Sequence, residues 1–267
     1  MTYSRLATVQ LILCLLWGHL HLAQANAPTV EAGETGEVPD IPLPDEGPRL
    51  EGHAEGVEAL AFQEGLNAYR REAWSQARRF FEKVTTPQPP SLLAPSGLAF
   101  LAEATIRENG SNTNRLEGIN LYKTLLRDYP ASANAHRAMW RMGDVYLEQG
   151  WYQEAHSMYA RALAAESKTA DGQRALLGSG YASLGLGRWA DAVQAFQDLR
   201  KLATQDPIHI AATVGLAHAF YRQHRPADAR AMFHTAYRRW PRAFRLDRRA
   251  LQRFAEIEMG LRHAALG

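Results

Sequence analysis

The feature that most constrains this fold is an internal repeat with a period of about 37 residues. In five places a small residue is followed after four positions by an aromatic residue and after seven by a small or aliphatic one. The small residues are Ala77, Gly118, Ala155, Ala192 and Ala229, and the aromatic residues are Phe81, Tyr122, Tyr159, Phe196 and Phe233. These spacings put all three positions on one face of a helix. One helix pair cannot bury such a face alone, so we expect the repeats to stack.

A second set of small residues, twelve positions upstream, predicts the other helix of each repeat. It consists of Gly65, Gly143, Gly180 and Ala217. In the second repeat Ile106 stands at this distance, and Ala102 fits the role instead. A small residue is expected here because the two helices of a pair cross closely. The second repeat is four residues longer, and the polar run 109–114 places the extra residues at the tip of its helix pair.

These patterns predict an all-α chain of five helix pairs followed by a capping helix. The expected helices are 57–71 and 73–85, 92–108 and 114–128, 133–149 and 152–166, 171–185 and 189–203, and 208–223 and 226–239. Pro241 ends the fifth pair, and apolar residues at near-helical spacing predict a last amphipathic helix over 243–265. It would cover the apolar face left by the fifth pair.

The repeats resemble the tetratricopeptide repeat (TPR) family. The third repeat carries its small and aromatic positions at Met142, Gly143, Tyr146, Ala155, Tyr159 and Ala162, and the fifth at Leu216, Ala217, Phe220, Ala229, Phe233, Ala236 and Pro241. The resemblance implies a right-handed superhelical solenoid over 57–241, with repeats at about 58–90, 92–130, 133–167, 171–205 and 208–241. The 37-residue period is longer than the family's usual one and is similar to that of exported bacterial cell-envelope TPR proteins.

Residues 1–25 have the features of a secretory signal peptide. Arg5 is followed by an apolar stretch, and Ala23-Gln24-Ala25 forms a small-x-small cleavage site that predicts Asn26 as the mature N-terminus. An uncleaved membrane anchor is the alternative, but the apolar stretch is short for a span. Lipidation of Cys14, the only cysteine, is disfavoured because Leu13 rather than a small residue precedes it.

Residues 26–56 form an acidic, Pro- and Gly-rich leader with a net charge of −7. Few large apolar side chains are present, so the leader is expected to be disordered by itself. It is interpreted as a flexible spacer, or else as a segment that docks on a basic face of its own solenoid or of a partner.

The C-terminal region 242–267 is predicted to be a basic capping helix. A basic patch spans its start and the end of the fifth repeat: Arg238, Arg239, Arg242, Arg245, Arg248, Arg249 and Arg253. The patch is either the solvated outer face of the cap or an anion-binding end that contacts an acidic protein, anionic lipid headgroups or a cell-wall polymer. A nucleic-acid partner is not expected, because the run lacks interleaved stacking aromatic residues.

The sequence contains no arrangement that predicts catalysis, a cofactor or a metal site. No His pair has ligand spacing with a carboxylate partner, and no nucleophile motif occurs in the mature chain. The cluster Gly178-Ser179-Gly180 lacks the Lys and the strand–loop–helix context of a phosphate loop. Gly180 is already explained by helix crossing, so we expect a non-enzymatic protein.

In the TPR resemblance, the first helix of each repeat lines the concave face. The candidate partner-binding residues there are Tyr69, Glu103, Arg107, Arg137, Trp140, Asp144, Glu148, Arg174, Tyr181, His218 and Arg222. Mixed charges and aromatic rings suit a peptide or a helix of another protein. The alternative is that several of them, Trp140 and Tyr181 above all, only pack between neighbouring helices.

The sequence therefore predicts a periplasmic or secreted scaffold or adaptor of the bacterial cell envelope that binds a partner segment in the concave groove. One alternative is a structural subunit permanently assembled in an envelope or outer-membrane biogenesis complex. Another is an accessory protein that binds cell-wall glycan. Weak contact with an anionic membrane or cell-wall surface is compatible with the basic patch.

Overall fold

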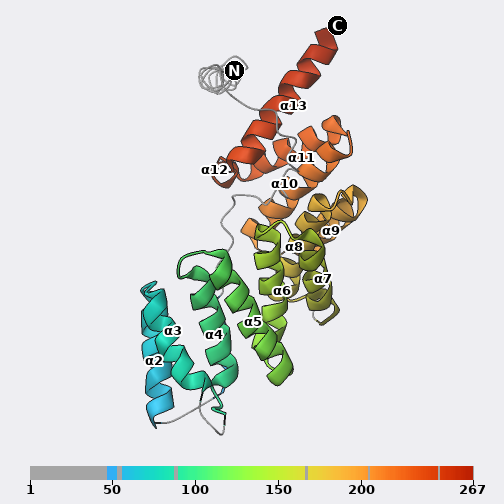
Figure 1. Ribbon diagram of the computed structural model, residues 1–267. Coiled ribbons are helices and arrows are strands. Elements are labelled where there is room, and N and C mark those ends of the chain that lie inside the picture. The colour runs from blue at the N-terminus through green and yellow to red at the C-terminus, as the bar shows by residue number, and fades with distance from the viewer. Residues whose placement is uncertain are drawn as a thin grey trace.

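The computed structural model describes residues 47–52, 56–86, 90–165, 168–203, 205–245 and 247–266, with side chains described as far as residue 259. Within these ranges the chain is helical and contains no strand. The helices form successive antiparallel pairs that stack in chain order, from α2 and α3 at one end to α13 at the other (Figure 1). The all-α solenoid predicted from the repeat is therefore confirmed.

The helix bounds agree with the repeat to within two residues. The pairs are α2 (Gly56–Arg70) and α3 (Trp74–Thr85), α4 (Ala94–Arg107) and α5 (Asn112–Asp128), α6 (Ala133–Glu148) and α7 (Tyr152–Ala165), α8 (Ala170–Gly185) and α9 (Trp189–Leu202), and α10 (Asp206–Arg222) and α11 (Pro226–Arg239). Each pair packs against the next, and the first helices α6, α8 and α10 also contact one another directly.

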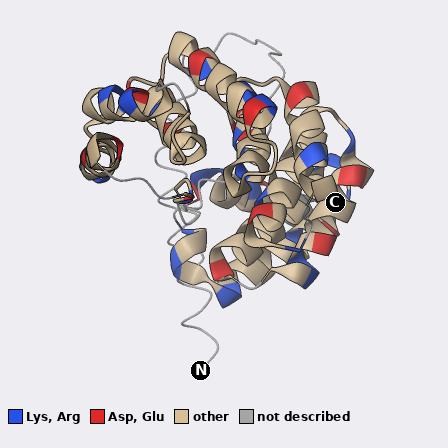
Figure 2. Cartoon of the chain, turned by 90° about the horizontal axis from the view of Figure 1, so that it is seen from below, with Lys and Arg blue, Asp and Glu red and all other residues tan. Residues whose placement is uncertain are grey.

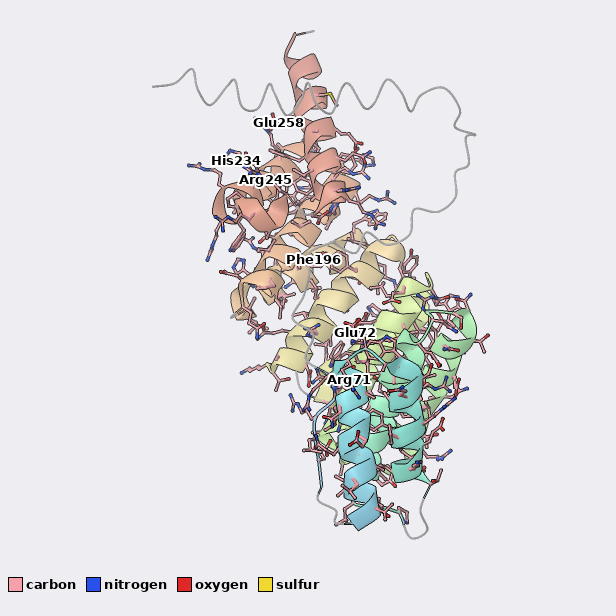
Figure 3. All side chains as sticks on the ribbon, turned by 90° about the vertical axis from the view of Figure 1, so that its left-hand side faces the viewer. Arg71, Glu72, Phe196, His234, Arg245 and Glu258 are labelled. Atoms are coloured by element: carbon pink, nitrogen blue, oxygen red, sulfur yellow. The ribbon has the colours of Figure 1, made fainter. Side chains whose placement is uncertain are left out.

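The repeat positions form the core. Every small residue and aromatic residue of the repeat is buried, and Tyr159, Phe196 and Phe233 are 0% exposed. Phe196 lies in the middle of the stack (Figure 3). A Cβ added at Gly180 or at Gly215 would lie 2.6 Å from the Phe196 ring. One aromatic side chain therefore packs against a glycine of its own repeat and a glycine of the next, which explains why both positions must be small.

The tips of the helix pairs share one backbone feature. Glu72, Gly150, Gly187 and His224 occupy equivalent turns, and each has a φ between 57° and 73°. Glycine adopts this left-handed conformation without steric cost, whereas other residues lose roughly 1–2 kcal/mol. The first and fifth pairs thus contain strained turns. Figure 3 shows Glu72 beside Arg71 at the tip of the first pair.

The C-terminal region differs from the single helix predicted over 243–265. It contains a short helix α12 (Pro241–Phe244) and a long helix α13 (Arg248–Leu266). The break arises because the Asp247 carboxylate accepts a hydrogen bond from the backbone N–H of Ala250 at 2.9 Å, which caps α13. Phe244 is fully buried, with Phe233 of α11 and Phe254 of α13 around it. The end of α13 projects beyond the last pair (Figure 1).

None of the helices within the described ranges is long and apolar enough to cross a membrane. The predicted signal peptide and most of the acidic leader lie outside the described residues. Residues 47–52, at the end of that leader, are described, and they contact the solenoid through the hydrogen bonds set out below.

Candidate functional site

Several of the predicted concave-face residues belong to a polar network inside the stack. Glu103 of α4 is 2% exposed and accepts hydrogen bonds from Arg141 of α6 and from the hydroxyl of Tyr122. Burial alone would raise the pKa of Glu103, but the Arg141 guanidinium outweighs it, and the pKa falls to about 2. This ion pair therefore joins the second and third repeats.

The network continues through Asp144. This residue accepts hydrogen bonds from Arg141 at 3.1 Å and from the hydroxyl of Tyr159 at 2.7 Å. Burial raises the pKa of Asp144 although Arg141 and Tyr159 oppose the shift. Burial likewise raises the pKa of Glu148, against the attraction of Arg115. These carboxylates serve to connect helices, and only Glu148 is exposed.

Trp140 lies beneath a group of arginines. Its ring is 3% exposed, and its indole N–H donates to Asp171 Oδ1 at 3.1 Å. The guanidinium groups of Arg137 and Arg174 lie 5.4 and 5.2 Å from the centre of this ring. Arg137 Nη1 also lies 3.7 Å from Asp171 Oδ1. The cluster holds Asp171 in a fixed orientation through its Oδ1 atom.

The remaining predicted residues are either buried or half-buried. Tyr181 and His218 are at most 2% exposed, and the Tyr181 hydroxyl donates to the backbone oxygen of Ala211. These two residues therefore pack between helices. Arg107 lies over the rings of Tyr69 and Trp74, and Arg222 lies over the ring of Trp189. Tyr69, Arg107 and Arg222 are all half-buried.

The described end of the leader crosses the starts of three first helices. Asn134, the second residue of α6, binds the leader's backbone: its Oδ1 accepts from the Arg49 N–H at 2.8 Å, and its Nδ2 donates to the Arg49 oxygen at 2.8 Å. The Ser96 hydroxyl of α4 accepts from the Glu51 N–H at 2.6 Å. These side chains bind the N–H and C=O groups of the segment's main chain, the groups that a neighbouring β-strand would also bind.

The Glu51 carboxylate sits at the N-terminus of α6. It accepts hydrogen bonds from the backbone N–H of Ala133 and of Asn134, at 3.1 and 2.8 Å. The Ser132 hydroxyl and Asn134 Nδ2 donate to it as well, at 2.8 and 2.6 Å. The free N–H groups and the dipole of a helix N-terminus favour such an anion. Four donors therefore form a built site for one carboxylate.

Arg49 reaches the next repeat. Its Nη2 donates to Asp171 Oδ2 at 3.1 Å, the carboxylate oxygen that Trp140 leaves available. Asn134 and Asp171 are 37 residues apart and so occupy equivalent positions at the starts of α6 and α8. Below, "first-turn surface" means Ser96, Ser132, Ala133, Asn134 and Asp171. Seen from below, the helices of the stack lie along a curve (Figure 2).

The first-turn surface was not among the predicted sites. Several of the predicted residues, such as Arg107, Glu148 and Arg222, lie at the C-terminal ends of the first helices, whereas the residues that hold the segment stand at the starts. Ser132-Ala133-Asn134 and Thr169-Ala170-Asp171, one repeat period apart, are a signal that could have identified it. Both runs begin with a capping hydroxyl, and capping explained them without reference to a ligand.

The basic patch is largely on the surface. Arg238, Arg239, Arg242, Arg245, Arg248 and Arg249 are exposed, while Arg253 is half-buried, packs over Tyr221 and pairs with Glu256 at 3.2 Å. Figure 3 shows Arg245 at the C-terminal end of the stack. Among the described residues no cluster of His, Cys, Asp and Glu has a metal-binding arrangement.

Comparison with known proteins places these repeats in a family. Residues 140–207 and 214–252 match the tetratricopeptide repeat. A search of curated proteins finds no significant match. The structure is similar to that of MamA 41-end from Desulfovibrio magneticus RS-1, with 21% identity, a TM-score of 0.58, and coverage of 69% of this chain and 96% of that one.

Two further MamA structures are similar. MamA AMB-1 is 18% identical with a TM-score of 0.53, over 68% of this chain and 91% of its own. MamA MSR-1 is 16% identical with a TM-score of 0.53, over 68% and 95%. At these identities the likeness shows a shared fold. With the family match, it confirms the resemblance drawn from the sequence: residues 140–207 and 214–252 of this chain are tetratricopeptide repeats.

Proposed function

We propose that this chain is a non-enzymatic protein-interaction scaffold that holds an extended segment of a partner protein on the first-turn surface. The observation that carries the proposal is that the side chains of Asn134 and Ser96 form hydrogen bonds with the backbone N–H and C=O groups of the segment 47–52. Side chains that satisfy the N–H and C=O groups of an added extended segment form a general peptide-binding device. The stacked pairs fix the starts of α4, α6 and α8 relative to one another.

A selection from a displayed peptide library tests this function. The selected peptides are titrated by fluorescence anisotropy against the wild-type chain, the Asn134→Ala variant and the Asn112→Ala variant. Asn112 is the matched control because it is exposed in the first turn of another helix, α5. Binding that is lost only with Asn134→Ala supports the proposal. Binding that survives Asn134→Ala places the interaction on another surface and contradicts the proposal.

The cell-envelope location is part of the same proposal. It rests on the sequence of residues 1–25, with their basic start, apolar stretch and Ala23-Gln24-Ala25 site. N-terminal sequencing of the protein, produced in a bacterial host with residues 1–25 in place, tests it. A mature chain that begins at Asn26 in the periplasmic fraction is the expected result, and an intact Met1 in the cytosolic fraction would contradict it.

A further inference from the structure

The segment at 48–52 has the properties of a peptide ligand in a specific site. Arg49 and Glu51 are two positions apart, so in an extended chain both side chains lie on one face. Both bind the first-turn surface, whereas the intervening Leu50 is 63% exposed. The main chain is held at Arg49 by the Asn134 side chain and at Arg49 and Glu51 by the Ser96 hydroxyl. Alternate side chains thus supply selectivity and the backbone supplies general affinity.

The two side-chain positions differ in chemistry. The Glu51 position offers four donors and the positive end of the α6 dipole, which fits a carboxylate and no cation. The Arg49 position offers Asp171 Oδ2, with Oδ1 already engaged by the Trp140 N–H. A cation at the first position and a carboxylate two residues later are therefore both needed for complementarity.

The residue after Glu51 is constrained as well. Gly52 has a φ of +81°, and a Cβ built on it would lie 2.1 Å from the backbone oxygen of Leu92. Any other residue would need both a left-handed backbone and a displaced main chain at the start of α4. The site therefore reads Arg-x-Glu-Gly, the sequence of residues 49–52.

We infer that the first-turn surface selects extended segments with an arginine and, two residues later, a glutamate followed by glycine, and that residues 49–52 occupy it as an intramolecular ligand that a partner displaces. The inference rests on the proposed function and adds the chemistry of the partner. Attachment to the same chain gives the leader a high effective concentration. A partner segment can bind only those chains in which the surface is vacant. Its apparent association constant is therefore the intrinsic constant multiplied by the vacant fraction.

The test uses a fluorescein-labelled peptide of residues 45–54 and the full mature chain. It is titrated against the wild type and against the Arg49→Ala/Glu51→Gln variant, in which the leader has lost both side-chain contacts. The matched control is Arg70→Ala/Glu64→Gln, which makes the same charge changes at two exposed positions of α2. Circular dichroism melts check that each variant is folded.

The expected result is that the peptide binds the Arg49→Ala/Glu51→Gln variant at least about tenfold more tightly than the wild type or the control, because the intramolecular competitor is removed. Adding Asn134→Ala abolishes this binding. A peptide with Glu51→Gln or Arg49→Ala binds at least about tenfold more weakly than the parent peptide, as loss of a charge-assisted bond to a built site requires.

Equal affinity for the wild type and the variant would overturn the inference, because the leader would not be the competitor. So would dependence of the leader's amide protection on chain concentration, which would mean that a second copy supplies the segment. If library peptides without the Arg-x-Glu pattern bind in an Asn134-dependent way and this peptide does not, the inference fails and the proposed function stands. If no peptide binds, both fail.

Discussion

Replacing Asn134 with alanine is expected to release residues 47–52 from the solenoid. The Asn134 side chain is fully buried and makes three hydrogen bonds to the segment: one from the Arg49 N–H, one to the Arg49 oxygen and one to the Glu51 carboxylate. A neutral hydrogen bond contributes about 0.5–1.5 kcal/mol net, and one to a charged group about 1.5–3 kcal/mol. The three together contribute about 2.5–6 kcal/mol, so docking of the segment weakens by roughly 70- to 25,000-fold.

Amide hydrogen exchange measures this change directly. The reporter is the Glu51 N–H, because its acceptor is the Ser96 hydroxyl and the substitution leaves that acceptor in place. Its protection falls only if the segment leaves the surface. The Asn112→Ala variant provides the control at an exposed first-turn asparagine. Protection of Glu51 that stays within about twofold of the wild type in Asn134→Ala would refute the reasoning, since a lost docking energy of this size must appear in local opening.

Other substitutions test the stack itself. Gly178→Ala places a Cβ 2.2 Å from the Tyr159 ring and should lower the free energy of unfolding in urea by about 1–3 kcal/mol. The neighbouring Ser179→Ala is the control and should have a small effect. A gain in stability from Gly178→Ala would contradict the packing. Phe196→Ala removes a fully buried ring and should cost about 3–5 kcal/mol, and a loss below about 1 kcal/mol would exclude its core role. The pKa of Glu103 in the folded chain is about 2, below its ordinary 4.5, so its contribution of about 3 kcal/mol to stability is complete above pH 4.5 and is lost as the pH falls towards 2. Glu103→Gln should therefore make the free energy of unfolding depend less on pH between 4.5 and 2. An unchanged pH dependence would count against the ion pair with Arg141. His224→Gly relieves a left-handed turn and should stabilise the chain by about 1 kcal/mol, whereas destabilisation would show that its side chain matters more than its backbone.

The repeat could be predicted from the sequence because its signal is geometric. The small and aromatic positions represented by Ala155 and Tyr159 are present at helical spacing in every repeat. Burying these side chains requires the helix pairs to stack. The break between α12 and α13 could not, because the periodicity of Leu251 and Phe254 continues through it and Asp247 resembles an ordinary surface acid. The contacts of Phe244 with Phe233 and Phe254 accompany this break, and such tertiary contacts do not show in the sequence pattern.

The candidate site was harder to predict because the sequence pattern does not show which residues on one face of a helix are buried by the neighbouring helices. Trp140 and Tyr181 were placed on the concave face by their position, yet contacts with the adjacent first helices bury both. Asn134 and Asp171 look like helix-start residues, and their role appears only when the leader is laid across them. The sequence did offer docking of the leader on its own solenoid as an alternative, although it placed the attraction on a basic face. The structure instead uses a helix N-terminus and a buried amide.

The most direct measurement of the central claim is a nuclear Overhauser experiment on residues 26–267 labelled with ¹⁵N. The Asn134 side-chain amide protons donate to the Arg49 oxygen and to the Glu51 carboxylate. They should therefore show cross-peaks to the backbone protons of residues 49–51, in samples dilute enough for the chain to be monomeric. Cross-peaks from these protons to solvent alone, with the leader signals at random-coil positions, would contradict the account.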